Sequence, residues 1–216
     1  MRFIGITGGV GAGKSAILSY LARKPKTRVM LADEIAHSLM EPGSDCYRQI
    51  VKRFVGEDIF AEQVFLHREE LGKQVAANRP FDKGKLAQII FSNPRKREAM
   101  NAIVHPAVKD YVRQQYESEQ KKGQMELLVF EAALLIEEKY DEICDELWYI
   151  YTSEENRRQR LVESRGYSQA KIDGIFKSQL SEQEFRKFTQ VTIDNNGDLE
   201  ETYEQIENAL RRQADE

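Results

Sequence analysis

The chain has 216 residues, with 41% hydrophobic residues, 31% charged residues and a net charge of −4. This length is enough for one α/β core with an insertion and too short for two large domains. The sequence contains no run of five residues of like charge that would indicate a binding surface for nucleic acid or an anionic membrane. We therefore expect neither a nucleic-acid partner nor a membrane partner.

The first predicted element is a short apolar strand at residues 2–7, and it leads into the sequence GGVGAGKS at residues 8–15. This sequence matches the pattern G-x-x-x-x-G-K-[S/T] between a strand and a helix, which is typical of a phosphate-binding loop. Glycines allow the tight turn that points backbone N–H groups inward, and the following helix adds a positive partial charge. Lys14 is expected to reach the β- and γ-phosphates of a nucleotide, and the Ser15 hydroxyl to hold Mg²⁺.

Four further short apolar segments are predicted as strands, at residues 29–32, 127–130, 146–151 and 191–193. Helical patterns separate them, at residues 14–23, from 34 to about 120, at 154–183 and after Asp198. Among the breaks expected in the long helical stretch is one at Pro106, where a new helix starts or the old one kinks. Strands that alternate with helices indicate a parallel sheet covered by helices on both faces, a three-layer α/β/α arrangement with five strands.

The organisation predicted from these elements is a single domain in three parts. The core covers about residues 1–40, 121–153 and 189–216. A helical stretch at about residues 41–120 is too long for a simple crossover, so we expect it to form a separate lobe. A charged helical segment at about residues 154–188 follows the fourth strand.

Two acidic residues follow predicted strands at the edge where ligands of such sheets bind. Asp33 could accept the proton of an attacking hydroxyl group, or it could cap the helix that follows it. Glu131 could lie in the outer shell of a bound Mg²⁺, or it could simply face solvent.

The helix expected after the fourth strand carries four arginines, Arg157, Arg158, Arg160 and Arg165. Two of them are expected to contact the phosphates, although such a run is usually only a solvated helix face. Ordinary structural roles are also open for three other residues. His105 could be a buried, hydrogen-bonded histidine, and Asp82 with Lys83 could be a surface ion pair of little energetic weight.

Cysteine use and hydropathy bear on the cellular compartment. Cys46 and Cys144 lie far apart without a paired motif, so we expect free thiols in a reducing compartment. The most apolar segment, residues 127–136, is too short to span a bilayer, and no targeting pattern begins the sequence. These features predict a cytoplasmic protein.

The N-K-x-D motif of GTP switches is absent, which argues against a signalling GTPase.

Seven motifs follow one another along the chain: IGITGGVGAGKS at 4–15, ADEIAH at 32–37, FDKGKL at 81–86, IVHP at 103–106, LLIE at 134–137, RL with Arg165 at 160–165, and IDNNG at 193–197. This ordered set resembles the dephospho-coenzyme A kinase family of P-loop kinases over nearly the whole chain. The chain departs from the family pattern at Glu131, Ala133, Lys83, Ile175 and Gln190.

The resemblance implies transfer of the ATP γ-phosphoryl group to the 3′-hydroxyl of the ribose in dephospho-CoA, the last step of coenzyme A synthesis. It implies that Asp33 and Lys14 are catalytic and that Asp33, Asp82 and His105 bind the acceptor. It also implies that the helical lobe at about residues 41–120 binds the acceptor and that the segment at about residues 154–188 closes over the site as a lid. Mg²⁺ is the expected cofactor, held by Ser15 with Glu131 in its outer shell. The expected ATP-binding residues are Gly11, Ala12, Gly13, Lys14, Ser15, Ala16, Arg160, Arg165, Asn195 and Gly197.

Two other functions remain open at the level of sequence. One is a small kinase that acts on a nucleotide or a nucleoside, which would share the loop and the lid. The other is a non-catalytic ATP sensor, for which Asp33 would be dispensable. The oligomeric state is not predicted by any feature of the sequence.

Overall fold

The computed structural model describes residues 1–60 and 79–212. The chain divides into two compact units, Met1–Ala32 with Tyr116–Glu216, and Asp33–Gln115. The helical conformation predicted for residues 61–78 lies outside the described residues.

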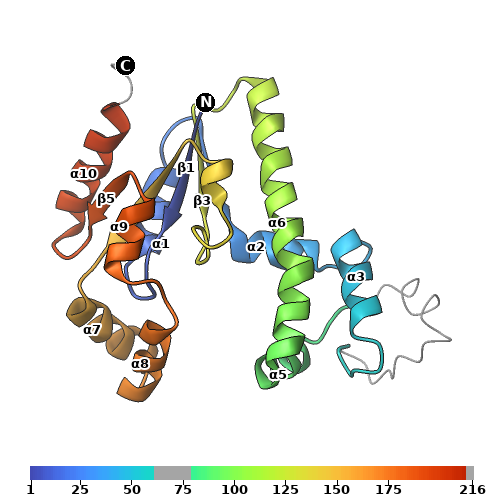
Figure 1. The fold of residues 1–216 in the computed structure, drawn as a ribbon. Helices are drawn as coiled ribbons and strands as arrows, with labels where there is room; N and C mark the ends of the chain where they lie inside the picture. Colours follow the sequence, from blue (N-terminus) through green and yellow to red (C-terminus); the bar gives the residue numbers. More distant parts are fainter. Residues whose placement is uncertain (61–78, 213–216) are drawn as a thin grey trace. The chain divides into compact units, whose positions relative to one another are not determined.

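The first unit contains a five-stranded sheet in the order β2-β3-β1-β4-β5, and every neighbouring pair of strands is parallel (Figure 1). The strands are β1 (Arg2–Thr7), β2 (Thr27–Leu31), β3 (Leu127–Glu131), β4 (Glu146–Tyr151) and β5 (Val191–Asp194). The predicted parallel sheet is therefore confirmed. β2 begins two residues earlier than expected, and Ala32 belongs to the helix that follows it.

Side chains alternate across the sheet, so each face is covered by different helices. On one face, Ile4, Ile6 and Trp148 pack in a buried cluster with residues of α1 (Lys14–Ala22) and α10 (Leu199–Arg211). On the other face, three aromatic contacts join sheet residues to elements above them: Phe3 with Tyr116 of α6 (Pro94–Lys122), Phe130 with Tyr140 of η2 (Tyr140–Glu142), and Tyr149 with Phe185 of α9 (Glu182–Phe188). These contacts produce the predicted three layers.

The strand order creates a switch point at the centre of the sheet. The chain leaves β1 toward β2 on one side, and it leaves β4 toward β5 on the other side. In open α/β sheets, ligands bind beyond the carboxyl ends of strands at such a point. The glycine-rich loop at residues 8–13 follows β1 at this edge.

The segment predicted as a lid consists of three helices, α7 (Glu154–Arg165), α8 (Gln169–Lys177) and α9. Each begins with a serine whose side chain accepts a hydrogen bond from a backbone N–H of the first turn. α7 ends at Gly166, whose φ of 61° lies in the left-handed region that favours glycine at a helix end. Capping therefore explains how one charged stretch becomes separate helices.

The second unit is helical in its described part and contains most of α2 (Ala32–Leu39), α3 (Asp45–Arg53), α5 (Lys83–Ser92) and the first part of α6. The prediction that a new helix starts at Pro106 is wrong, because α6 continues through this residue. Proline removes one backbone donor, and buried Val104 and Val108 on either side hold the helix in place. No helix among residues 1–60 and 79–212 is both long and apolar enough to cross a membrane.

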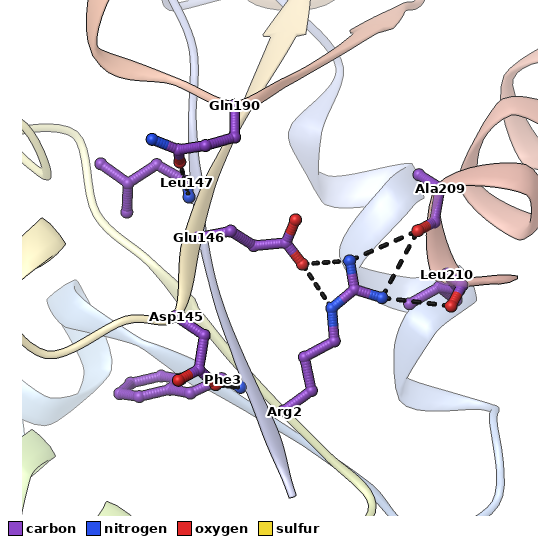
Figure 2. Close-up of polar contacts among 8 residues, drawn as sticks. All are labelled: Arg2, Phe3, Asp145, Glu146, Leu147, Gln190, Ala209 and Leu210. Carbon is purple, nitrogen blue, oxygen red and sulfur yellow. Dashed lines mark hydrogen bonds and ion pairs between the residues drawn. The ribbon is translucent and has the colours of Figure 1, made fainter. Parts of the chain in front are cut away.

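A polar network closes the amino end of the sheet (Figure 2). Arg2 of β1 forms an ion pair with buried Glu146 of β4 and donates to the carbonyls of Ala209 and Leu210 in the last turn of α10. Gln190, where the family pattern has an acidic residue, accepts a 2.7 Å hydrogen bond from the Leu147 N–H. The uncharged amide oxygen of Gln190 is sufficient here, because the Leu147 N–H needs only a hydrogen-bond acceptor and not a negative charge.

Candidate active site

The phosphate-binding loop predicted from the sequence joins β1 directly to α1. Gly13 is the N-cap residue of α1, with φ 84° and no side-chain cap on the helix. The first-turn N–H groups are therefore not capped by a side chain, and the positive end of the helix dipole lies at the loop. This is the arrangement that binds phosphate groups at helix N-termini.

Lys14 lies between the ends of two neighbouring strands. Its Nζ donates a 2.7 Å hydrogen bond to the Gly8 carbonyl, and it lies 3.5 Å from Glu131 Oε1. The structure thus brings together two predicted site residues from opposite halves of the core sequence. The longer glutamate side chain, where the family pattern has aspartate, reaches the loop lysine directly.

Ser15 is exposed at the start of α1, and its hydroxyl has no hydrogen-bond partner among the described residues. Ala16, also predicted to bind ATP, donates its N–H to the Gly13 carbonyl at 3.2 Å. Because the Ser15 hydroxyl is exposed and has no partner among the described residues, it is available to a ligand, as its predicted role requires.

The turn after β5 is hydrogen-bonded to the phosphate-binding loop. Asn195 is buried; its Nδ2 donates to the Ala12 carbonyl at 2.7 Å, and its Oδ1 accepts from Thr202 at 3.1 Å. The Asn195 amide is therefore used to hold the phosphate loop, a role that the sequence did not indicate. Gly197, two residues further on, is exposed.

The arginines of α7 have different environments. Arg160 donates from Nη2 to the Asn195 carbonyl at 2.8 Å, so it lies beside the residue that holds the loop. Arg165 is exposed and lies against Tyr167, where its hydrogen bond lowers the pKa of the phenol. Arg157, which the sequence did not favour over its neighbours, contacts the loop itself, with Nε 2.9 Å from the Val10 carbonyl. The signal that could have found it is its spacing from buried Leu161, four residues later on the same helix face.

Asp33 lies in the first turn of α2, in the second unit. The helix already begins at Ala32, and the Asp33 carboxylate makes no capping hydrogen bond, so the alternative that it is a helix cap is wrong. The side chain is exposed and has no partner in the described part of the chain. A carboxylate in this state can accept a proton from a substrate.

Asp82 and His105 also belong to the second unit. Asp82 is the N-cap of α5 and accepts a 2.9 Å hydrogen bond from the Lys85 N–H, so it is not the surface partner of Lys83. His105 lines a cavity of about 330 Å³ within this unit. Most of the cavity wall is apolar and includes Leu86, Met100 and Val104.

The fold and site are those of a P-loop kinase: a parallel sheet with this strand order, a glycine-rich loop after β1, and a lysine at the end of that loop. Residues 2–83 and 76–201 match the sequence model of the dephospho-CoA kinase family. The chain therefore belongs to the dephospho-CoA kinase family, as its motifs predicted.

Curated relatives agree with this assignment, and solved structures agree with the fold. Dephospho-CoA kinase of Symbiobacterium thermophilum is 33% identical over 98% of this chain and 81% of its own length, and that of Shouchella clausii is 32% identical over 99% of both chains. The structure of TT1252 from Thermus thermophilus has a TM-score of 0.70 at 24% identity and covers 98% of this chain and 97% of its own. Dephospho-CoA kinase from Campylobacter jejuni has a TM-score of 0.62 at 17% identity, over 98% of this chain and 96% of its own. At these identities the two structures establish the fold alone.

Proposed function

We propose that this chain transfers the γ-phosphoryl group of ATP to the 3′-hydroxyl of the ribose in dephospho-CoA, giving coenzyme A and ADP. The observation that carries the proposal is an intact phosphate loop, with Lys14 held between Gly8 and Glu131, in a chain that belongs to this family over nearly its full length. In the reaction, loop N–H groups such as that of Gly11, together with the Lys14 ammonium group, bind the triphosphate and stabilise the charge on the transferred group. The Ala12 and Ala16 N–H groups instead donate to the Gly9 and Gly13 carbonyls within the loop.

Asp33 is proposed to accept the proton of the attacking ribose hydroxyl. Its support is that the carboxylate follows the carboxyl end of β2 by two residues, is exposed, and has no partner within the described residues. Phosphoryl transfer needs a group that orients the nucleophile and takes its proton, and aspartate has this role in other kinases.

Mg²⁺ is the proposed cofactor, and the donor set at the loop suits it. The exposed Ser15 hydroxyl and the Glu131 carboxylate supply oxygen atoms, which Mg²⁺ prefers. Among the described residues, no group of three or more His, Cys, Asp or Glu side chains could hold a metal ion alone. Mg²⁺ is usually bound through one or two protein groups and the phosphates of the substrate. When bound, the ion neutralises charge on the β- and γ-phosphates.

The helical unit is proposed to bind dephospho-CoA. Its largely apolar cavity suits an extended organic arm better than a bare phosphate, and His105 and Lys83 in the cavity wall offer polar groups. Asp82 would act there mainly by fixing the start of α5, since its carboxylate accepts the Lys85 N–H.

The segment 154–188 is proposed to close over ATP as a lid, with Arg160 and Arg165 near the phosphates and the turn of Asn195 and Gly197 near the base. Closure would exclude water, which competes with the ribose hydroxyl for the γ-phosphoryl group. A cytoplasmic location is also proposed, supported by the unbridged Cys46 and Cys144.

The test is a panel of acceptors incubated with the full chain, ATP and Mg²⁺, with products identified by mass. We expect one phosphoryl group to be added to dephospho-CoA and none to nucleosides or nucleoside monophosphates. Phosphorylation of a nucleoside or nucleoside monophosphate alone would assign the chain to a different small kinase. ATP binding without phosphorylation of any acceptor would identify a sensor.

A further inference from the structure

The start of the phosphate loop is a tight turn over residues 9–12. The Ala12 N–H donates to the Gly9 carbonyl at 3.1 Å, and Gly11, the third residue of the turn, has φ 85°. A positive φ at the third position is the signature of a type II turn. Type II and type I turns differ mainly in the orientation of the central peptide group, here the one between Val10 and Gly11.

Two side chains of the segment 154–188 hold the polar groups of Val10. Arg157 Nε donates to the Val10 carbonyl at 2.9 Å, and Gln179 Oε1 accepts from the Val10 N–H at 3.3 Å. The two side chains are joined to each other, because Arg157 Nη2 donates to Gln179 Oε1 at 2.6 Å. The lid segment and the phosphate loop are therefore linked by a closed set of three hydrogen bonds.

The guanidinium group of Arg157 is packed tightly against the loop. Its central carbon lies 4.2 Å from the centre of the Phe176 ring, and a methyl group placed on Gly9 would be 2.3 Å from it. Burial lowers the pKa of this guanidinium, and no carboxylate in the described part of the chain forms an ion pair with it. Arg158, the next residue, instead pairs with Glu154 and Asp173.

These contacts determine the direction of a predicted phosphate donor. In a planar trans peptide the C=O and N–H groups point in opposite directions. Because Arg157 holds the Val10 carbonyl, the Gly11 N–H of the same peptide group points away from Arg157. Releasing that carbonyl would let the peptide group rotate toward the type I orientation, and the Gly11 N–H would then leave the loop's set of donors.

We propose that Arg157 is a positioning residue for the kinase reaction, which together with Gln179 fixes the Val10–Gly11 peptide and so couples the lid segment to the phosphate loop. The inference rests on the proposed function in that the loop must bind the triphosphate of ATP. It differs from the roles expected of Arg160 and Arg165, because Arg157 acts through the backbone of the loop.

The experiment compares R157M and R157K with the matched variant R158M in the full chain. Methionine keeps a long stem against Phe176 but removes the donors, whereas lysine keeps the charge but cannot donate to Val10 and Gln179 in a fork. Binding of the non-hydrolysable analogue AMP-PNP with Mg²⁺ is measured by calorimetry, and thermal melting is measured in parallel. We expect R157M and R157K to weaken binding by about tenfold or more and R158M by less than about twofold.

Binding of AMP-PNP by R157K at the wild-type affinity would overturn the proposal, because charge alone would then be sufficient. Wild-type affinity in R157M would overturn it as well. If R157M does not fold, Q179L provides the decision, since loss of its acceptor should weaken binding severalfold and unchanged binding contradicts the coupling. None of these measurements uses dephospho-CoA, so a failure of the proposed acceptor is seen separately.

Discussion

Arg2 and Arg157 place guanidinium groups against backbone carbonyls at opposite ends of the same sheet. At the amino end, Arg2 contacts the carbonyls that end α10, and buried Glu146 neutralises its charge (Figure 2). At the carboxyl end, Arg157 contacts the Val10 carbonyl and the Gln179 amide, and no described carboxylate pairs with it.

The two arginines differ in whether a carboxylate neutralises the guanidinium charge. A buried charge that is paired and hydrogen-bonded contributes to the fold and leaves little field outside. A charge left without a counter-ion beside a ring of N–H groups adds to the positive potential that attracts a polyphosphate. Substitutions at the two ends should therefore have separable effects, on activity at the carboxyl end and on stability at the amino end.

The largest effect on activity is expected for K14A. If the Lys14 ammonium group binds the triphosphate as proposed, its removal should lower phosphoryl transfer by about 10³-fold or more, with little change in thermal melting. Transfer is measured as coenzyme A formed with saturating dephospho-CoA. The control is K26A, because the ion pair of Lys26 with Glu126 is exposed. Retained transfer in K14A would show that the loop assignment is wrong.

D33N tests an exposed carboxylate in contrast to the buried one of Glu146. If Asp33 takes the hydroxyl proton, turnover should fall by about 10²–10⁴-fold while AMP-PNP still binds. E34Q, one residue further on α2 and also exposed, is the matched control and should stay near wild type. Equal turnover of D33N and E34Q would remove Asp33 from the chemistry.

R2M tests the amino end. It leaves the Glu146 carboxylate, with 4% of its side chain exposed, without its partner, so the free energy of unfolding should fall by about 3 kcal/mol. For a chain of this size, that corresponds to a Tm about 6–12 °C lower. The double variant R2M/E146L should recover much of the loss, and kcat/KM per folded molecule should not change. A loss of activity without a loss of stability would break the contrast between the two ends.

The smallest effect is expected for R165A. The side chain is exposed, so water and salt screen its charge, and the ratio of ATP hydrolysis to transfer should rise by no more than about fivefold. The ratio is obtained from ADP and coenzyme A measured in the same reaction. An unchanged ratio and an unchanged transfer rate would place Arg165 on a solvated helix face with no part in the lid.

The sheet could be predicted from the sequence because its strands are short apolar runs between helical patterns. The bounds expected for β4 are those observed, since a run of six residues is short for a helix and its aromatic side chains favour a buried strand. Of the two alternatives expected at Pro106, the start of a new helix is wrong, because packing on both sides of the proline outweighs its missing donor and α6 continues through it. Local signals therefore gave the elements, and tertiary contacts decided the exceptions.

The candidate site was predictable where its chemistry lies in one continuous segment. The loop at residues 8–15 carries its own pattern, and Glu131 was expected from its place at a strand end. The contacts of Asn195 with Ala12 and of Arg157 with Val10 join residues 183 and 147 positions apart, which no local pattern encodes. The sequence could indicate that some arginines of α7 matter, but only the folded helix shows which one meets the loop.

The central position of β1 has a consequence for synthesis on the ribosome. This apolar strand has β3 and β4 as its two neighbours, and β3 begins only at Leu127. At about 5–20 residues per second, roughly 6–25 s pass between the emergence of β1 and that of its first pairing partner. During this interval, an uncovered strand with unpaired edges is a natural binding site for a chaperone, and the phosphate loop that follows it cannot yet bind ATP.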